Sequence, residues 1–293
     1  MSDTTYSPPA KRQPATRSAR LSPSSVEYRV TNPVNHTRHS TTPHPETKTQ
    51  SHDIAQNISC GHCSLTNLCI PVGVGAKELQ KLDENIIHHE TLKRGQHWFR
   101  AGDRFRSIYA VRSGCIKTYI LTGAGEEQIC GFHLPGEIIG LDAIDCGFYK
   151  SSAKVLQTSS VCEIPFDRLD NLLNDIPSLQ KQLLRIMSKE IDNDQWLITL
   201  LGKTSADARV AAFLCNLSHR FAVRGYSAYD FILGMPRHDI ANYLGLAVET
   251  VCRVFTRFQQ QKYLTANGKQ IQIHELKKLY ELTGTLPLPA YLI

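Results

Sequence analysis

The sequence contains no uninterrupted run of about 18 apolar residues, the length that a membrane-spanning helix requires. Its opening residues, MSDTTYSPPAKRQPATRS, also lack the apolar stretch of a secretory signal. These two absences predict a cytoplasmic protein with no membrane partner. Paired acid and base residues, nucleophile motifs and phosphate-binding glycine loops are missing as well, so the sequence predicts that the protein is not an enzyme.

Cysteine, in contrast, is plentiful. Nine cysteines in a chain without an export signal argue against a disulfide framework and indicate metal or redox chemistry. Three of them, Cys60, Cys63 and Cys69, form a C-x₂-C-x₅-C pattern that can wrap around one metal centre. Both zinc, with His62 as a possible ligand, and an iron–sulfur cluster fit this spacing. The spacing leaves a fourth ligand open among Cys115, Cys130, Cys146, Cys162, Cys215 and Cys252.

Composition divides the chain into four segments. Residues 1–50 hold seven of the 14 prolines and seven Lys and Arg against three Asp and Glu, which predicts a disordered basic tail. In residues 51–176 short apolar runs alternate with Gly and Pro-Gly turns, which is typical of a β-sandwich or barrel. Residues 177–203 predict a long helix, and 204–293 predict shorter helices with one hairpin. The basic tail and the net positive charge of residues 204–273 are compatible with a nucleic-acid partner.

The long helix is predicted over residues 177–202. Pro177 suits its first turn and Gly202 suits its end. Its apolar stripe must pack on its own domain or on a second copy of the chain, and the spacing does not decide between them. The stripe is expected to comprise Leu179, Leu183, Ile186, Ile191, Ile198 and Leu201.

The C-terminal segment predicts a helix–turn–helix. A short helix over residues 235–245 is followed, after a glycine turn, by a second one over 247–261. In the run 264–273, Asn267 and Gly268 are predicted to form a two-residue hairpin turn, so that the hairpin forms a wing.

The outer face of the second helix carries Glu249, Cys252, Arg253 and Arg257. A carboxylate can accept a hydrogen bond from cytosine and a guanidinium can bind guanine with two, so Glu249 and Arg253 suit a G·C pair in the major groove. Arg257 is expected to reach a phosphate. The alternative is a solvated Glu–Arg pair one helical turn apart, which is common on any helix.

From about residue 55 to 275 the chain resembles the fumarate–nitrate reduction regulators of the cyclic-AMP receptor protein superfamily. The resemblance implies an α+β fold, with an N-terminal β-roll sensor domain (a jelly-roll), a long dimerisation helix and a C-terminal winged helix–turn–helix. It rests on the cysteine pattern at 60–69 and on GFHLPGEIIGLDAI (131–144), VCEIPF (161–166), IMSKEI (186–191) and DIANYLGLAVETVCR (239–253).

The resemblance also implies a cofactor and its ligands. Cys60, Cys63, Cys69 and Cys162 would hold a [4Fe–4S] cluster, with Cys162 identified by its place in the VCEIPF segment. In such proteins oxygen converts the cluster to [2Fe–2S], the dimer weakens and DNA is released. A regulator of the same family that senses through zinc or free thiols is the alternative.

The implied partners are a second copy of the chain, double-stranded DNA and RNA polymerase. The family binds a palindromic operator of the form TTGAT-N4-ATCAA, which brings the guanine of each half-site to Arg253 and its cytosine to Glu249. The family places a polymerase-activating surface at residues 122–127. The dimer would form through the long helix, where like charges of Asp194 near the two-fold axis would keep the dimer weak. The dimerisation residues are predicted to be Ile186, Met187, Ile191 and Asp194.

Two departures from the superfamily pattern alter the expectations. After Gly140 the chain continues with Leu141, Asp142 and Ala143, without the Glu of the cyclic-nucleotide branch, and the later Arg-Ser pair is absent from KSSAKVLQ. We therefore expect no cyclic-nucleotide ligand. Cys252 replaces a Ser that the family usually carries on the recognition helix, and a thiol is the weaker hydrogen-bonding group.

Overall fold

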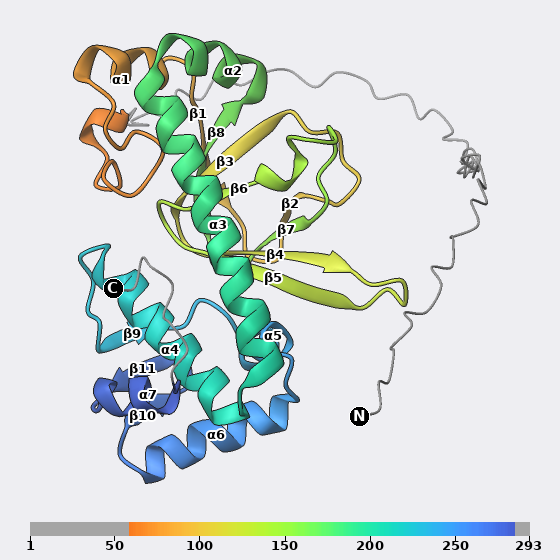
Figure 1. Cartoon of the computed structure of the whole chain (residues 1–293), viewed down its shortest axis with the longest axis vertical. Coiled ribbons are helices and arrows are strands. Elements are labelled where there is room, and N and C mark those ends of the chain that lie inside the picture. Colours follow the sequence, from red (N-terminus) through yellow and green to blue (C-terminus); the bar gives the residue numbers. More distant parts are fainter. Residues whose placement is uncertain (1–58, 285–293) are drawn as a thin grey trace, which may run out of the picture. The chain divides into compact units, whose positions relative to one another are not determined.

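The computed structural model describes residues 59–284, and the predicted tail, residues 1–50, lies outside them. Its N-terminal part is a β-roll of two four-stranded antiparallel sheets, ordered β1-β8-β3-β6 and β2-β7-β4-β5 (Figure 1). Aromatic and branched side chains from both sheets, among them Phe99, Tyr109, Ile116 and Val161, form a shared core. The strands are β1 (Ile87–Leu92), β2 (His97–Phe99), β3 (Ser107–Ser113), β4 (Ile116–Leu121), β5 (Glu127–His133), β6 (Ile138–Ile139), β7 (Ser152–Val155) and β8 (Ser159–Pro165).

Short helices accompany the β-roll and lead into the long helix α3. A 3₁₀ turn, η1, and the helix α1 precede β1, η2 follows β6, and α2 follows β8. Helix α2 and the start of α3 bury their apolar residues against the first sheet. The bounds are η1 (Cys60–His62), α1 (Ala76–Asp83), η2 (Leu141–Ala143), α2 (Phe166–Asp175) and α3 (Pro177–Lys203).

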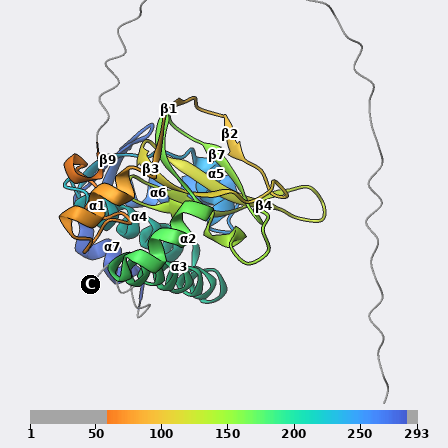
Figure 2. The ribbon, with the colours of Figure 1, turned by 90° about the horizontal axis from the view of Figure 1, so that it is seen from above.

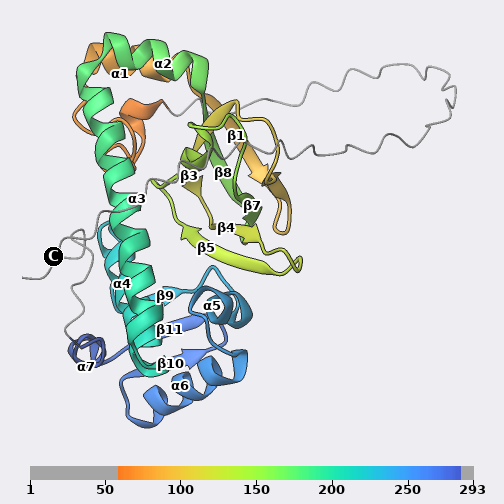
Figure 3. The same ribbon diagram turned by 45° about the vertical axis from the view of Figure 1, so that its right-hand side comes forward.

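Helix α3 runs alongside the β-roll and on to the C-terminal helices (Figures 1 and 3). Pro177 occupies its first turn as predicted, because that position needs no amide donor. Gly202 lies inside its last turn, and the helix ends at Lys203. Although α3 has 27 residues, no helix within residues 59–284 combines the length and apolar character needed to cross a membrane.

The prediction of a single apolar stripe on α3 is wrong, because the helix has two apolar faces. Leu179 and Leu183 are buried in the core beneath the β-roll. Ile191 and Ile198 lie on the other face and are 59% and 70% exposed. Seen from above (Figure 2), α3 lies at the edge of the described fold, which leaves this second face uncovered. The 3.6-residue period cannot separate two stripes that lie this close together on one helix.

The C-terminal part is a winged helix–turn–helix. Its apolar core is continuous with side chains of β4 and β5, including Tyr119, Ile129 and Phe132. The predicted α+β architecture is therefore confirmed in all three of its parts. The elements are α4 (Ala206–Ala222), β9 (Asp230–Ile232), α5 (Arg237–Tyr243), α6 (Val248–Gln260), β10 (Leu264–Asn267), β11 (Gln270–Ile273) and α7 (Leu276–Leu282), with the wing strands ordered β10-β11-β9.

The turn of the wing lies one residue later than predicted. Asn267 pairs with Gln270, so Gly268 and Lys269, rather than Asn267 and Gly268, form the two-residue loop. Gly268 has a φ of +58°, which glycine adopts without steric cost at the first position of such a loop. The Asn-Gly signal located the hairpin correctly but not its register.

Candidate metal centre and DNA-reading helix

Hydrogen bonds within the loop and to two helices hold the segment that carries Cys60, Cys63 and Cys69. The hydroxyl of Thr66 donates to the carbonyl oxygen of Cys63 at 2.7 Å and also to that of Cys60. The amide of Cys60 donates to Oδ1 of Asp83 in α1 at 2.8 Å, and the side-chain amide of Gln182 in α3 donates to the Cys69 carbonyl at 3.4 Å. The loop is thus fixed to two helices.

Cys162 joins the three loop cysteines around one cavity. It lies in the middle of β8, paired with His88 on β1 and with Ala110 on β3. The cavity is lined by Cys60, Cys63, Cys69 and Cys162 together with apolar side chains that include Ile70 and Ile164.

The other five cysteines lie elsewhere. Cys115 and Cys215 are buried in the C-terminal core, whereas Cys130, Cys146 and Cys252 are exposed. Within residues 59–284, no histidine lines the cavity itself, although Nδ1 of His88 lies 3.4 Å from the sulfur of Cys162. His62 is exposed, and its Nδ1 lies 3.0 Å from the hydroxyl of Ser59. The structure therefore brings together the four cysteines that the resemblance implies.

Burial raises the pKa of three thiols, those of Cys60, Cys69 and Cys162. The pKa of Cys69 rises to about 12 through burial and then through its neighbours Cys162 and Cys63. That of Cys162 rises to about 11, again mainly through burial, although Arg112 opposes the shift. The pKa of Cys60 rises as well, through burial and through Asp83. Each thiolate would disfavour ionisation of the neighbouring thiols. This donor set therefore needs a cationic centre before its thiols can ionise together.

The four cysteines line one cavity. In the described part of the chain, no three His, Cys, Asp or Glu side chains are grouped as ligands of one metal ion. A single zinc ion would require its ligand atoms at about 2.0–2.3 Å from one centre. In an iron–sulfur cluster with Cys₄ ligation each thiolate binds a different part of a larger group. The four thiols of this cavity fit Cys₄ ligation of such a group, and four thiolates are also a donor set for zinc.

Helix α6 presents the predicted outer face to solvent. Val251, Val254, Phe255 and Phe258 are buried, as expected for the inner face of the second helix. On the outer face, Glu249, Cys252, Arg253 and Arg257 are all exposed.

Two of these side chains have further neighbours. Arg257 forms an ion pair with Asp207 at the start of α4, so it is already engaged within the chain. Cys252 lies close to the guanidinium of Arg237, which stacks on the Phe255 ring with its central carbon 3.4 Å from the ring centroid.

The exposed face of α3 carries a regular apolar seam. Leu184, Met187, Ile191 and Ile198 are 62%, 36%, 59% and 70% exposed, at the three- and four-residue spacing of a coiled-coil seam. Asp194 occupies the position between Ile191 and Ile198 in this pattern. Leu184 was missed in the sequence, although the spacing from Met187 could have revealed it.

Ile186, one of the predicted dimerisation residues, does not belong to this seam. It is partly buried and packs on the core of the sensor domain. Met187, Ile191 and Asp194 lie on the exposed side.

Two family models match the chain, the Crp-like helix-turn-helix domain over residues 208–282 and the cyclic nucleotide-binding domain over residues 89–175. The transcriptional activator protein Anr of Pseudomonas aeruginosa is 52% identical over 225 residues, covering 77% of this chain and 92% of that protein. The fumarate and nitrate reduction regulatory protein of Escherichia coli K12 is 49% identical over 227 residues, covering 78% and 91%. The chain belongs to the fumarate–nitrate reduction regulators. Its relatives are transcription regulators, so the prediction that this regulator is not an enzyme is confirmed.

Solved structures agree with this assignment of the regulator. FixK2 of Bradyrhizobium japonicum superposes with a TM-score of 0.62 at 26% identity, covering 68% of this chain and 98% of that one. The two structures therefore share the succession of β-roll, long helix and helix–turn–helix.

Proposed function

We propose that the chain is an anaerobic transcription regulator whose homodimer binds a TTGAT-N4-ATCAA-like operator while a [4Fe–4S] cluster is held by Cys60, Cys63, Cys69 and Cys162. The observation that carries this proposal is the convergence of these four thiols, from a loop and from β8, on one cavity. When bound, the cluster would supply the reactivity with oxygen that makes the regulator sensitive to air.

The chain's own residues hold the site ready for such a group. Thr66 and Asp83 fix the loop backbone, and apolar side chains, among them Ile70 and Ile164, line much of the cavity. Removal of bound metal leaves thiols with raised pKa values, which retain their protons at neutral pH. A zinc sensor is the second candidate, because four thiolates can also hold one zinc ion; the similarity to the fumarate–nitrate reduction regulators supports the cluster.

Glu249 and Arg253 lie on the exposed face of α6, and this position supports their binding in the major groove. The opposite, apolar face of α6 packs on the core and anchors the helix. Arg257 would first have to leave Asp207 before it could reach a phosphate. Cys252 would lie in the same groove, where its thiol can offer only a weak hydrogen bond.

Arg253→Ala is expected to weaken specific operator binding by about 1–3 kcal/mol, roughly fivefold to 150-fold, because one bidentate guanine contact is lost. The loss of affinity should be large on the operator that contains the guanine and small on an operator in which that guanine is replaced. Gln260→Ala, at an exposed position in the last turn of the same helix and two turns beyond Arg253, serves as the control. Equal affinity of parent and Arg253→Ala in a salt-matched fluorescence anisotropy titration would refute the assignment.

Two further features support the remaining partners. The hairpin between β4 and β5 has an exposed tip at residues 122–126, closed by a hydrogen bond from the Thr122 amide to the Glu126 carbonyl at 2.9 Å, and we propose that it contacts RNA polymerase. We propose no cyclic-nucleotide ligand, because Asp142 in η2 instead accepts a hydrogen bond from the Ser151 amide at 2.9 Å.

The experiment that tests the cofactor is an absorption spectrum of anaerobically purified protein, recorded as air is admitted and combined with assays of iron, sulfide and zinc. A broad visible band that bleaches in air, with about four irons and four sulfides per chain, is the expected result. Colourless protein with one zinc would overturn the oxygen-sensing part and leave DNA binding intact.

A further inference from the structure

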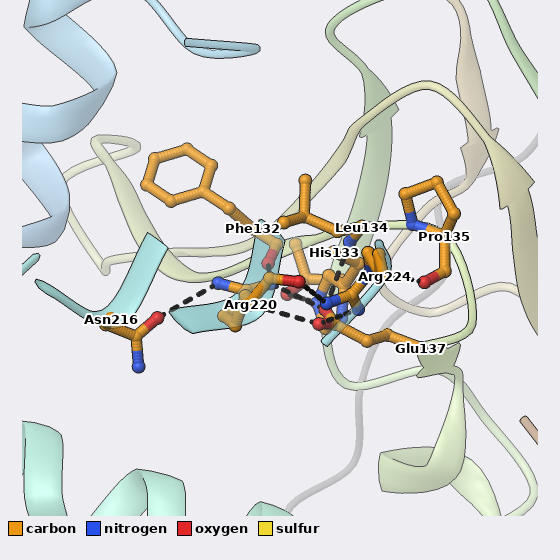
Figure 4. A network of polar contacts seen from close by, with 9 residues as sticks. Phe132, His133, Leu134, Pro135, Glu137, Asn216, Arg220 and Arg224 are labelled. Atoms are coloured by element: carbon orange, nitrogen blue, oxygen red, sulfur yellow. Dashed lines mark hydrogen bonds and ion pairs between the residues drawn. The ribbon is translucent and has the colours of Figure 1, made fainter. Parts of the chain in front are cut away.

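A carboxylate of the sensor domain is held by two arginines of the C-terminal domain (Figure 4). Glu137 lies in the turn between β5 and β6, and Arg220 and Arg224 lie in and just after the last turn of α4. Nη2 of Arg220 donates to Oε2 of Glu137 at 2.6 Å, and Nη2 of Arg224 donates to Oε1 at 2.5 Å. Nε of Arg220 adds a third hydrogen bond, to Oε1 at 3.0 Å.

The same arginines also hold the backbone that precedes Glu137. Arg220 donates to the carbonyl oxygen of Phe132 at 2.5 Å, and Arg224 donates to that of Pro135 at 2.7 Å. The Arg224 side chain is only 5% exposed. Burial would raise the pKa of Glu137, but the two guanidinium groups hold it at about 2. The carboxylate therefore stays ionised, and the contact persists at any physiological pH.

The other side of this turn faces the cysteine cavity. The amide of Val111 donates to the Glu137 carbonyl at 2.9 Å, and the amide of Gly136 donates to the Val111 carbonyl at 2.7 Å. Val111 lines the cavity that the four cysteines share. A Cβ on Gly136, which has a φ of +91°, would lie 3.1 Å from Cβ of Leu68, the residue before Cys69. The turn thus contacts both the cysteine loop and the strand behind it.

We infer that the turn of residues 134–137 is a relay that couples the cysteine site to the C-terminal domain within one chain, with Glu137 as its positioning residue. The inference rests on the proposed function for the identity of the signal, but not for the existence of the coupling. A displacement of Leu68 or Val111 cannot be absorbed in a close-packed turn, so it must move Glu137 and the arginines that it holds. By reciprocity, a change at Arg224 must also alter the cysteine loop.

A second ion contact between the same two domains provides a matched control. Nζ of Lys117 in β4 lies 3.1 Å from Oδ1 of Asp239 in α5 and 2.7 Å from Oε2 of Glu127. None of these three residues lines the cysteine cavity. Asp239→Asn removes one negative charge from the contact between the two domains, as Glu137→Gln does. Lys117 retains its ion pair with Glu127 in this variant.

The first test uses the metal-free, reduced full-length protein and the rate at which iodoacetamide alkylates Cys60, Cys63 and Cys69, followed by mass spectrometry. Glu137→Gln and Arg224→Gln are expected to accelerate alkylation of Cys69 on the order of threefold or more, and Asp239→Asn to leave it unchanged. Arg224 is informative because it lies in the other domain. Should Glu137→Gln fail to fold, Arg224→Gln alone decides. The relay would be overturned if Cys69 were alkylated in Glu137→Gln and Arg224→Gln at the rate of the parent protein. It would also be overturned if Asp239→Asn accelerated the alkylation equally.

The second test uses protein in which iron and sulfide have been shown to be present. The ratio of operator Kd after and before exposure to air should fall in Glu137→Gln, and the time course of bleaching should change, whereas Asp239→Asn keeps the parent ratio. An unchanged ratio and an unchanged time course would contradict the relay. If the assays find no cluster, the proposed cofactor fails, and the alkylation rates still decide on the coupling.

Discussion

Cys162→Ser is expected to lose the cluster and, with it, specific operator binding. The serine hydroxyl has nearly the same size as the thiol but does not ionise at neutral pH, so only Cys60, Cys63 and Cys69 would remain as ligands. Iron in the anaerobically reconstituted protein should fall from about four per chain to less than one. Operator affinity should fall on the order of tenfold or more, to the level of air-exposed parent protein.

The control for this change is Cys146→Ser, because Cys146 is exposed and its sulfur only donates weakly to the Phe148 carbonyl. It should retain full iron, sulfide and operator affinity. Thermal unfolding of the two metal-free variants, measured in parallel, separates loss of ligand from loss of fold. Full iron content in Cys162→Ser would contradict the assignment of this residue and return the fourth ligand to the other cysteines.

Asp194→Ala is expected to dimerise and to bind the operator in air. In a symmetric pair formed through the exposed seam of α3, Asp194 lies between Ile191 and Ile198 and approaches its own copy. Two carboxylates held about 5 Å apart repel each other by about 1–3 kcal/mol after screening, and alanine removes that repulsion. The dimer dissociation constant should fall roughly fivefold to 150-fold.

Sedimentation velocity in air measures this effect, with Gln195→Ala as the control, since Gln195 is exposed beside Asp194 but outside the seam.

The dimer is also expected to depend on pH. Burial raises the pKa of Asp194, and burial together with Glu137 and Asp194 raises the pKa of Glu190 to about 7. Pairing brings the carboxylates closer and raises their pKa further, so the dimer binds more protons and strengthens as pH falls. The parent should show this pH dependence more strongly than Asp194→Ala. A variant that stays monomeric at micromolar concentration would refute the role of Asp194.

Much of the candidate site could be predicted from local sequence. The spacing of Cys60, Cys63 and Cys69 and the exposed side of α6 follow from patterns within a few residues, where chain connectivity limits the possible arrangements. The choice of Cys162 as the fourth ligand came from its segment's resemblance to a family, because spacing alone left six thiols open. Pairing of β8 with β1 and β3 places it in the cavity.

Tertiary packing alone decided the rest. The periodicity of α3 predicted one stripe, and only the position of the β-roll against one side of the helix separates buried Leu179 and Leu183 from exposed Ile191 and Ile198. Nothing in the local sequence near Glu137 indicates that its partner is Arg224, 87 residues later. Partly buried ion pairs of this kind depend on the apposition of two domains, whereas periodicity and spacing report only neighbours along the chain.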